Sequence, residues 1–317
     1  MKKSVYLPSV PSVAPTEAEA NPHPVRQSSR SLTILAWLVV ALISTLPEIA
    51  WIELTGSSPA WLTYAKMGLL LALILATWVW QPVRPLRNFF LVMFAFFGLM
   101  ELRLRLNFTW PALQALFGTT VFDERMQAEQ IGKLAVSLAM VAVLLLLGFK
   151  HRDFFLTRGH LRAPIEPARW LGFPKADPWP TFGLQWGLYI AVALAVVQFF
   201  VLRPSGELML KVVPILPSIL FYAALNAFNE EITYRAPMLA TLEPVGGSKQ
   251  ALWLAAYFFG IAHYFGTPGG IFGGIASIFM GWILGKGMVE TRGLFWTWWI
   301  HFLSDIAIFT FLTAALL

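Results

Sequence analysis

The chain alternates between long apolar stretches and short polar segments, and this pattern constrains its fold more than any other feature. Stretches of about 17–25 apolar residues are long enough to cross a lipid bilayer as helices. They cover residues 32–52, 60–80, 86–102, 132–149, 181–202, 212–242, 249–265, 270–288 and 293–316. Apolar residues make up 57% of the chain and charged residues 13%, which excludes an ordinary soluble domain. We therefore expect an all-α, polytopic transmembrane helical bundle with about nine spans.

The polar segments divide the chain into four regions. In order, we expect a disordered cytoplasmic tail (1–31), accessory transmembrane helices (32–149), a basic, Pro- and Trp-rich interfacial loop (150–180) and a transmembrane core (181–317). Residues 107–122 are apolar but interrupted by Pro111 and Gly118. They are expected to re-enter the membrane or to lie along its surface.

The distribution of basic residues predicts the orientation. Lys and Arg are more frequent in the segments on the same side as the N terminus than in those on the other side. The positive-inside rule then places the N terminus in the cytoplasm and the C terminus outside. We expect an integral multi-pass protein of the bacterial inner (plasma) membrane, in contact with the lipid bilayer. No basic patch interleaved with aromatic residues indicates nucleic-acid binding.

Three charged residues lie within the apolar stretch 221–240. A charged side chain at the bilayer centre costs about 2.5–3.5 kcal/mol, so such residues usually face a bundle interior. Glu231 and Arg235 are four residues apart on one helix face, which favours an internal ion pair. Glu230 points about 100° away from Glu231, on the face that carries Asn226, and is free to reach across the bundle. The alternative is a purely structural ion pair at a helix end.

Two of the five histidines, His263 and His301, also lie in apolar stretches. Phe259 precedes His263 by one helical turn, and Asp305 follows His301 by one turn. At 1.5 Å per residue, these histidines, Asp305 and Glu230 lie roughly 12–21 Å from the cytoplasmic ends of their helices. Polar groups from three helices can therefore meet in one layer, although each histidine alone is also compatible with a hydrogen-bonded packing role.

Such a set of side chains supports a limited range of chemistry. A buried carboxylate can act as a general base, and a neutral imidazole beside it can orient a water molecule and transfer its proton. Neighbouring donors can stabilise the oxyanion of an attacked amide. The absence of cysteine excludes a thiol nucleophile. Glu230, His263 and His301 are also permitted zinc ligands, but there is no HExxH motif, so we expect no metal and no other cofactor.

The same residues form three short motifs in a fixed order. They are EExxxR (Glu230, Glu231, Arg235), FxxxH (Phe259, His263) and HxxxD (His301, Asp305). Together they resemble the CPBP intramembrane protease family, which includes the type II CAAX prenyl endopeptidases and the Abi-type bacteriocin self-immunity proteins. The resemblance covers roughly residues 181–317, so that the expected core is a CPBP-like catalytic core.

The resemblance implies a helical bundle with a cavity that opens to the membrane and the cytoplasm. By this similarity, Glu230 and His263 activate water, and His301 and Asp305 help to stabilise the oxyanion. The supporting residues would be Glu231, Arg235 and Phe259. The family commonly has Asn at the position of Asp305, and an ionised Asp cannot donate a hydrogen bond. Either Asp305 is protonated, or it orients His301 instead.

We therefore expect a metal-independent intramembrane endopeptidase of the glutamate type. Its substrate would be a membrane-associated protein or peptide, as in CAAX-type C-terminal processing or surface-protein maturation. The alternative is a non-catalytic bacteriocin-immunity or peptide-binding membrane protein. A transporter with a proton relay would predict inverted-repeat hydropathy, which the sequence does not show.

Overall fold

The structure, a computed structural model, describes residues 30–57, 60–118, 120–266 and 269–317. The expected tail of residues 1–31 lies outside these ranges except for its last two residues. The described secondary structure is helical, with isolated β-bridges only, between Pro164 and Pro178 and between Ala168 and Phe173. The predicted all-α class is therefore confirmed.

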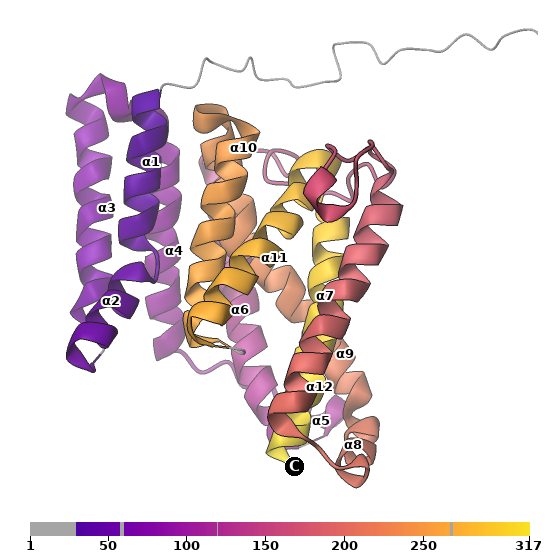
Figure 1. Cartoon of the computed structure of the whole chain (residues 1–317). Helices are drawn as coiled ribbons and strands as arrows, with labels where there is room; N and C mark the ends of the chain where they lie inside the picture. Colours follow the sequence, from indigo (N-terminus) through magenta and orange to yellow (C-terminus); the bar gives the residue numbers. More distant parts are fainter. Residues whose placement is uncertain (1–29, 58–59, 119, 267–268) are drawn as a thin grey trace, which may run out of the picture.

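The helices follow one another with short connections (Figure 1). The first half of the chain forms α1 (Arg30–Ile43), α2 (Leu46–Thr55), α3 (Trp61–Val79), η2 (Gln81–Leu86), α4 (Arg87–Arg105), α5 (Pro111–Phe117), α6 (Val121–Leu146) and η3 (Arg169–Leu171). The second half forms α7 (Trp179–Leu202), α8 (Gly206–Val212), η4 (Val213–Ile215), α9 (Leu216–Glu230), η5 (Glu231–Arg235), α10 (Ala236–Ala262), η6 (His263–Phe265), α11 (Gly270–Thr291) and α12 (Phe295–Leu316).

The described helices can cross a membrane many times. Seven are long and apolar enough to do so, or eight if α1 and α2, which meet at a bend of 45°, count as one span. One of the seven covers Gly206–Phe265, which would be about 90 Å long if straight, far more than a bilayer needs. Its backbone breaks at Gly247, where φ is 79° and ψ is 162°. If the parts before and after this break count as separate crossings, the total agrees with the predicted number of about nine.

The connections that hold most of the basic residues lie at one end of the bundle. The start of α1, η2, the loop between α6 and α7, the break in α10 and the turn between α11 and α12 all lie at the top of Figure 1. The C terminus lies at the opposite end. The loop is fixed to the α11–α12 turn, because the His160 N–H donates to the Thr291 carbonyl at 2.7 Å and the Leu294 N–H donates to the Thr157 carbonyl at 2.8 Å.

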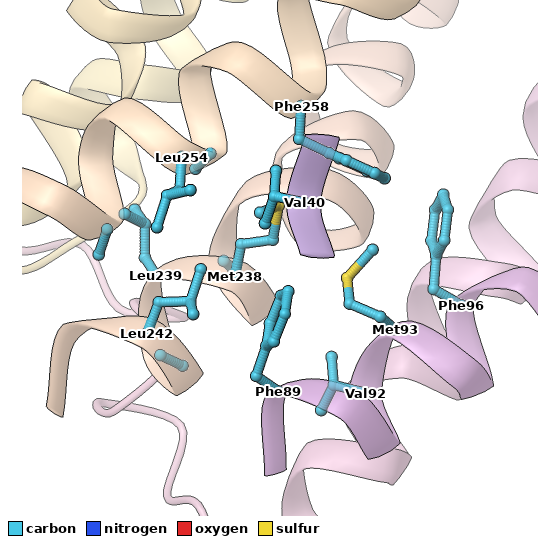
Figure 2. Close-up of a cluster of buried hydrophobic side chains, with 14 of the residues drawn as sticks. Val40, Phe89, Val92, Met93, Phe96, Met238, Leu239, Leu242, Leu254 and Phe258 are labelled. Carbon is cyan, nitrogen blue, oxygen red and sulfur yellow. The ribbon is translucent and has the colours of Figure 1, made fainter. Parts of the chain in front are cut away.

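A large apolar cluster joins the N-terminal helices to α10 (Figure 2). Val40 of α1 and Phe89 and Met93 of α4 pack there with Met238 and Leu239 of α10. Because lipid tails are as apolar as these side chains, close packing rather than exclusion of water stabilises such contacts inside a bilayer. This cluster holds the first helices against the element that follows the charged motif.

Helix α6 begins earlier than the predicted stretch 132–149. Thr120 caps it, since its hydroxyl accepts a hydrogen bond from the Asp123 N–H at 3.1 Å and the Asp123 carboxylate accepts one from the Thr120 N–H. This capping box starts the helix at Val121, in sequence too polar to be identified from hydropathy. In the described part of the preceding segment, expected to be re-entrant or interfacial, the chain forms the short helix α5.

Helices α10 and α11 approach each other closely at Gly260. A Cβ atom at this position would lie 2.2 Å from the backbone N of Ile278, whereas one at Gly274 would meet nothing nearer than the Gly260 carbonyl oxygen at 3.9 Å. Small residues allow such close approach between helices in membranes. The contact fixes the end of α10, directly before His263 of η6.

Gly260→Ala should therefore destabilise the bundle by about 1–3 kcal/mol, because the backbone of α11 has to move to admit the methyl group. The thermal unfolding temperature of the purified protein in detergent measures this effect. Gly274→Ala, in the same helix pair, is the matched control and should unfold close to the wild-type temperature. Equal unfolding temperatures for the two variants would contradict the close approach.

Candidate active site

The charged motif lies where the helix formed by α9 and α10 changes its geometry. The N–H of Ala236 bonds to the carbonyl of Glu231, five residues earlier, so that η5 is a π-helical turn rather than the regular helix expected from the sequence. Pro237 follows directly and has no N–H to donate, which weakens regular helical hydrogen bonding at this point. Single π-turns of this kind are frequent at functional sites.

Glu231 is fully buried and contacts two groups on opposite sides. Its Oε2 pairs with the guanidinium of Arg235, which is also fully buried. Its Oε1 lies 2.7 Å from Nδ1 of His301 on α12. Because an ionised carboxylate only accepts hydrogen bonds, Nδ1 of His301 donates to it. Glu231 therefore fixes the orientation of the His301 ring as well as balancing the charge of Arg235.

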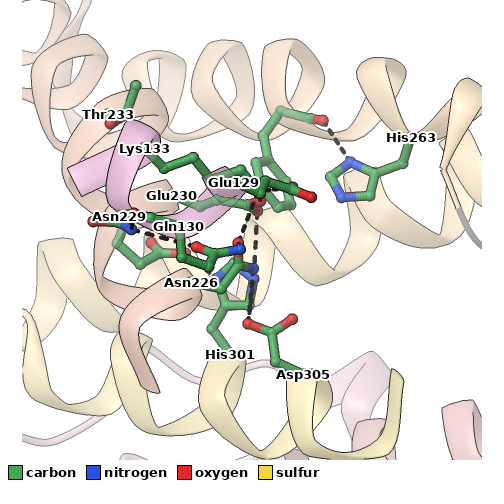
Figure 3. A network of polar contacts seen from close by, with 12 residues as sticks. Glu129, Gln130, Lys133, Asn226, Asn229, Glu230, Thr233, His263, His301 and Asp305 are labelled. Atoms are coloured by element: carbon green, nitrogen blue, oxygen red, sulfur yellow. Dashed lines mark hydrogen bonds and ion pairs between the residues drawn. The ribbon is translucent and has the colours of Figure 1, made fainter. Parts of the chain in front are cut away.

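Glu230 lies among Lys133, Asn226 and His301 (Figure 3). Its Oε1 accepts a hydrogen bond from Nζ of Lys133 on α6 at 2.9 Å. Its Oε2 lies 3.6 Å from Nε2 of His301. Asn226, one turn earlier on the same face, accepts a hydrogen bond from the same Lys133 ammonium at 2.8 Å. The two glutamates therefore have different partners. Glu231 pairs with Arg235. Glu230 pairs with Lys133, a residue that the sequence analysis did not include in the site.

Asp305 approaches the same nitrogen of the His301 ring as Glu230 does. Its Oδ2 is 3.6 Å from Nε2 of His301 and accepts a hydrogen bond from the Asn226 side-chain amide at 3.0 Å. In the hydrogen bond with Asn226 the carboxylate oxygen is the acceptor. Of the two alternatives for Asp305, these contacts favour orientation of His301 and Asn226 over donation to an oxyanion.

His263 approaches the site from the end of α10. Its Nδ1 lies 3.0 Å from the carbonyl oxygen of Phe259, and since a carbonyl only accepts, Nδ1 donates; in the neutral form of the ring Nε2 is then the acceptor. The Phe259 ring packs against His263, with ring centroids 4.5 Å apart, and against His301 at 5.9 Å. It also lies 4.6 Å from the Arg235 guanidinium. Phe259 thus separates the two histidines and covers the buried ion pair.

These polar groups line one cavity of about 540 Å³. Glu230, His263, His301 and Asp305 contribute to its wall together with Glu129, Lys133 and Asn226. Most of the remaining wall is apolar and comes from α7 and α11, including Trp186, Ile190, Leu194, Phe272, Ala276 and Met280. Among the hydrogen bonds of the described residues, none joins Glu230 directly to His263, so the two meet through the cavity rather than by contact.

Helix α6 contributes polar side chains that sequence reasoning missed. The Gln130 amide donates to Asn226 Oδ1 at 2.9 Å, and the Ser137 hydroxyl lies 2.9 Å from that of Thr233. A signal was present in the sequence, because Glu129, Lys133 and Ser137 repeat at intervals of four residues and so share one helix face. The expected division of the chain into accessory helices and a catalytic core stays a prediction. Helix α6 belongs to the expected accessory region, yet its side chains line the cavity.

The donor groups do not form a recognisable metal site. In the parts of the chain that the structure describes, no group of three or more His, Asp or Glu side chains is arranged to hold a metal ion. Glu230, His263 and His301, the possible zinc ligands, line the same cavity, but the hydrogen bonds above occupy Glu230 Oε1 and both Nδ1 atoms. Independence from metal stays a prediction.

Residues 212–307 match the family model of the Rce1-like type II CAAX prenyl endopeptidases. This segment contains all three motifs, and the match confirms the resemblance to the CPBP family. No curated protein and no solved structure shows significant similarity to the chain. Lys133 and the rest of α6 lie outside the matched segment.

Proposed function

We propose that this integral membrane protein is an intramembrane endopeptidase of the glutamate type, in which Glu230 and His263 activate a water molecule. One observation carries the proposal: Glu230, His263, His301 and Asp305, from three helices, line a single cavity whose other walls are largely apolar. The match to a peptidase family over the segment that holds these residues supports it. Binding alone would not require a carboxylate and an imidazole in the wall of one cavity.

The contacts suggest how hydrolysis would proceed. A water molecule between Glu230 and Nε2 of His263 gives a proton to the carboxylate as its oxygen attacks the carbonyl carbon of the peptide. The tetrahedral oxyanion is stabilised by His301 in its doubly protonated form, whose Nδ1–H donates to Glu231 and whose Nε2–H is free to donate to the oxyanion. The proton then passes to the leaving nitrogen, and the C–N bond breaks.

The cavity wall indicates the kind of substrate. Apolar side chains of α7 and α11, among them Ile190, Leu194 and Phe272, form most of it, which suits a peptide that approaches from the lipid or carries a lipid anchor. We propose a membrane-associated protein as substrate, processed near its C terminus in the CAAX manner or at a membrane-proximal site during surface-protein maturation. Basic residues are in excess at the end of the bundle where the described chain begins, which supports a cytoplasmic N terminus. We propose that the membrane is a bacterial inner membrane.

The test compares protein termini in membranes of cells that carry the wild-type chain or Glu230→Gln. New termini that appear only with the wild type would demonstrate proteolysis and identify the substrate. Identical termini, with both proteins present in equal amounts, would contradict the proposal and favour a peptide-binding or immunity protein. Treating the wild-type membranes with a zinc chelator should leave the new termini unchanged, whereas their loss would show that the reaction depends on a metal.

A further inference from the structure

Lys133 reaches the cavity from outside the segment matched to the peptidase family. Its Nζ contacts Glu230 Oε1 at 2.9 Å, Asn226 Oδ1 at 2.8 Å and Glu129 Oε1 at 3.0 Å. The side chain is only 16% exposed, and it is the only Lys or Arg among the residues that line the cavity in the described parts of the chain. The ammonium is therefore directed at Glu230 rather than at solvent.

The surrounding contacts hold Lys133 in this place. Four residues later on α6, the Ser137 hydroxyl donates to the Asn229 carbonyl at 3.1 Å. On the other side, Phe122 packs against Tyr222 of α9, with ring centroids 6.1 Å apart. Gln130 adds a hydrogen bond to Asn226. Helix α6 is thus fixed along α9 by contacts before and after Lys133, and the position of the ammonium follows from helix packing.

Two carboxylates face His301 at the same distance, those of Glu230 and Asp305, each 3.6 Å from Nε2. When both are ionised, two carboxylates around one nitrogen repel each other in a site shielded from water. A cation bound to one oxygen of Glu230 offsets this repulsion and leaves the other oxygen directed toward His301 and the cavity. The same ammonium binds Asn226, which in turn donates to Asp305, so it connects both carboxylates.

We propose that Lys133 is a positioning residue of the active site, which holds the Glu230 carboxylate in the orientation needed to activate water. This inference rests on the proposed function, since it assigns Lys133 a part in the same reaction. It also means that the N-terminal half of the chain completes the site, because the family-matched segment alone lacks the ammonium.

The test uses the full-length protein and the rate at which the wild-type-dependent termini appear in isolated membranes. Lys133→Met keeps the length of the side chain but removes the charge, and it should lower this rate about 100-fold, as expected when a reacting group is misplaced. The matched control is Lys66→Met. Lys66 is a buried lysine paired with Glu48 at 2.5 Å, away from the cavity, and its loss should leave the rate within a few-fold of the wild type if the enzyme is folded.

Chemical restoration of the charge separates positioning from a structural role. The chain contains no cysteine, so Lys133→Cys has a single reactive thiol. Treatment with 2-bromoethylamine rebuilds an ammonium at the length of lysine and should restore most of the rate. Iodoacetamide adds a neutral group of the same length and should restore none, while the untreated and both modified forms unfold at similar temperatures. Wild-type membranes treated with either reagent control for effects elsewhere.

The possible results distinguish this inference from the proposed function. Cleavage by the wild type together with wild-type rates in Lys133→Met would overturn the role of Lys133 alone. Equal recovery with both reagents would also overturn it, because volume rather than charge would then matter. If the wild type produces no new termini, the proposed function fails, and the role assigned to Lys133 fails with it.

Discussion

Glu230→Gln should lower the rate of peptide cleavage by about 100- to 10,000-fold, the contribution expected of a general base. The amide has nearly the same shape and can still accept the hydrogen bond from Lys133, so the fold of the cavity is preserved. It cannot take a proton from water, because the amide nitrogen and oxygen are not basic at neutral pH. The measurement is the rate at which the new termini accumulate, at matched protein levels.

Glu231, the neighbour of Glu230, provides the control for this variant. Glu231→Gln changes the adjacent, more deeply buried carboxylate into the same amide, but it weakens the pair with Arg235 and the hydrogen bond to His301. That variant should lower the unfolding temperature as well as the rate, whereas Glu230→Gln should lower the rate alone. If Glu230→Gln keeps the wild-type rate, another group must activate the water.

The convergence of the three motifs could be predicted from the sequence because it depends on local rules. Helical periodicity placed Asp305 beside His301 and separated Glu230 from Glu231. The rise of 1.5 Å per residue placed the groups at similar depth. In the structure, Glu230 and Asp305 both lie 3.6 Å from His301 Nε2. Depth does not determine the direction in which a helix face points, and His263 accordingly lines the cavity without touching Glu230.

The contribution of α6 could not be predicted from hydropathy, because its first turns are polar. The sequence from Asp123 to Gln130 has four charged residues and would be read as a loop, which left Lys133 at the edge of an apolar stretch. The capping box formed by Thr120 and Asp123 marks the true start of the helix. Only the packing of α6 against α9, a contact between residues about 100 positions apart in sequence, directs Lys133 to Glu230.

The π-helical turn at η5 is a further feature that helical spacing misses. The predicted ion pair between Glu231 and Arg235 assumed a regular helix, and the pair forms in a wider turn. Pro237 is the sequence signal for the irregularity, but its exact form depends on the neighbouring helices. Glu231 can therefore reach His301 on α12, an orienting contact that the sequence did not predict.

Arg235→Met should destabilise the protein by about 3–5 kcal/mol, the cost of removing one partner of a buried ion pair. Arg235 and Glu231 are both fully buried, so Glu231 would keep its charge with only His301 as a partner. The thermal unfolding temperature in detergent measures the loss. The rate of cleavage should fall too, because a Glu231 side chain that is no longer held by Arg235 orients His301 less well.

Arg292→Met is the control, because Arg292 pairs with Glu243 at 2.9 Å but is 42% exposed. A pair that remains in contact with water contributes about 0–1 kcal/mol, so its loss should shift the unfolding temperature little. In Arg235→Met combined with Glu231→Gln, the stranded charge is gone, and much of the stability should return. The rate of cleavage should stay low in this double variant, since a neutral amide does not hold the His301 ring as the carboxylate does. Recovery of both stability and rate would show that Glu231 has no part in orienting His301.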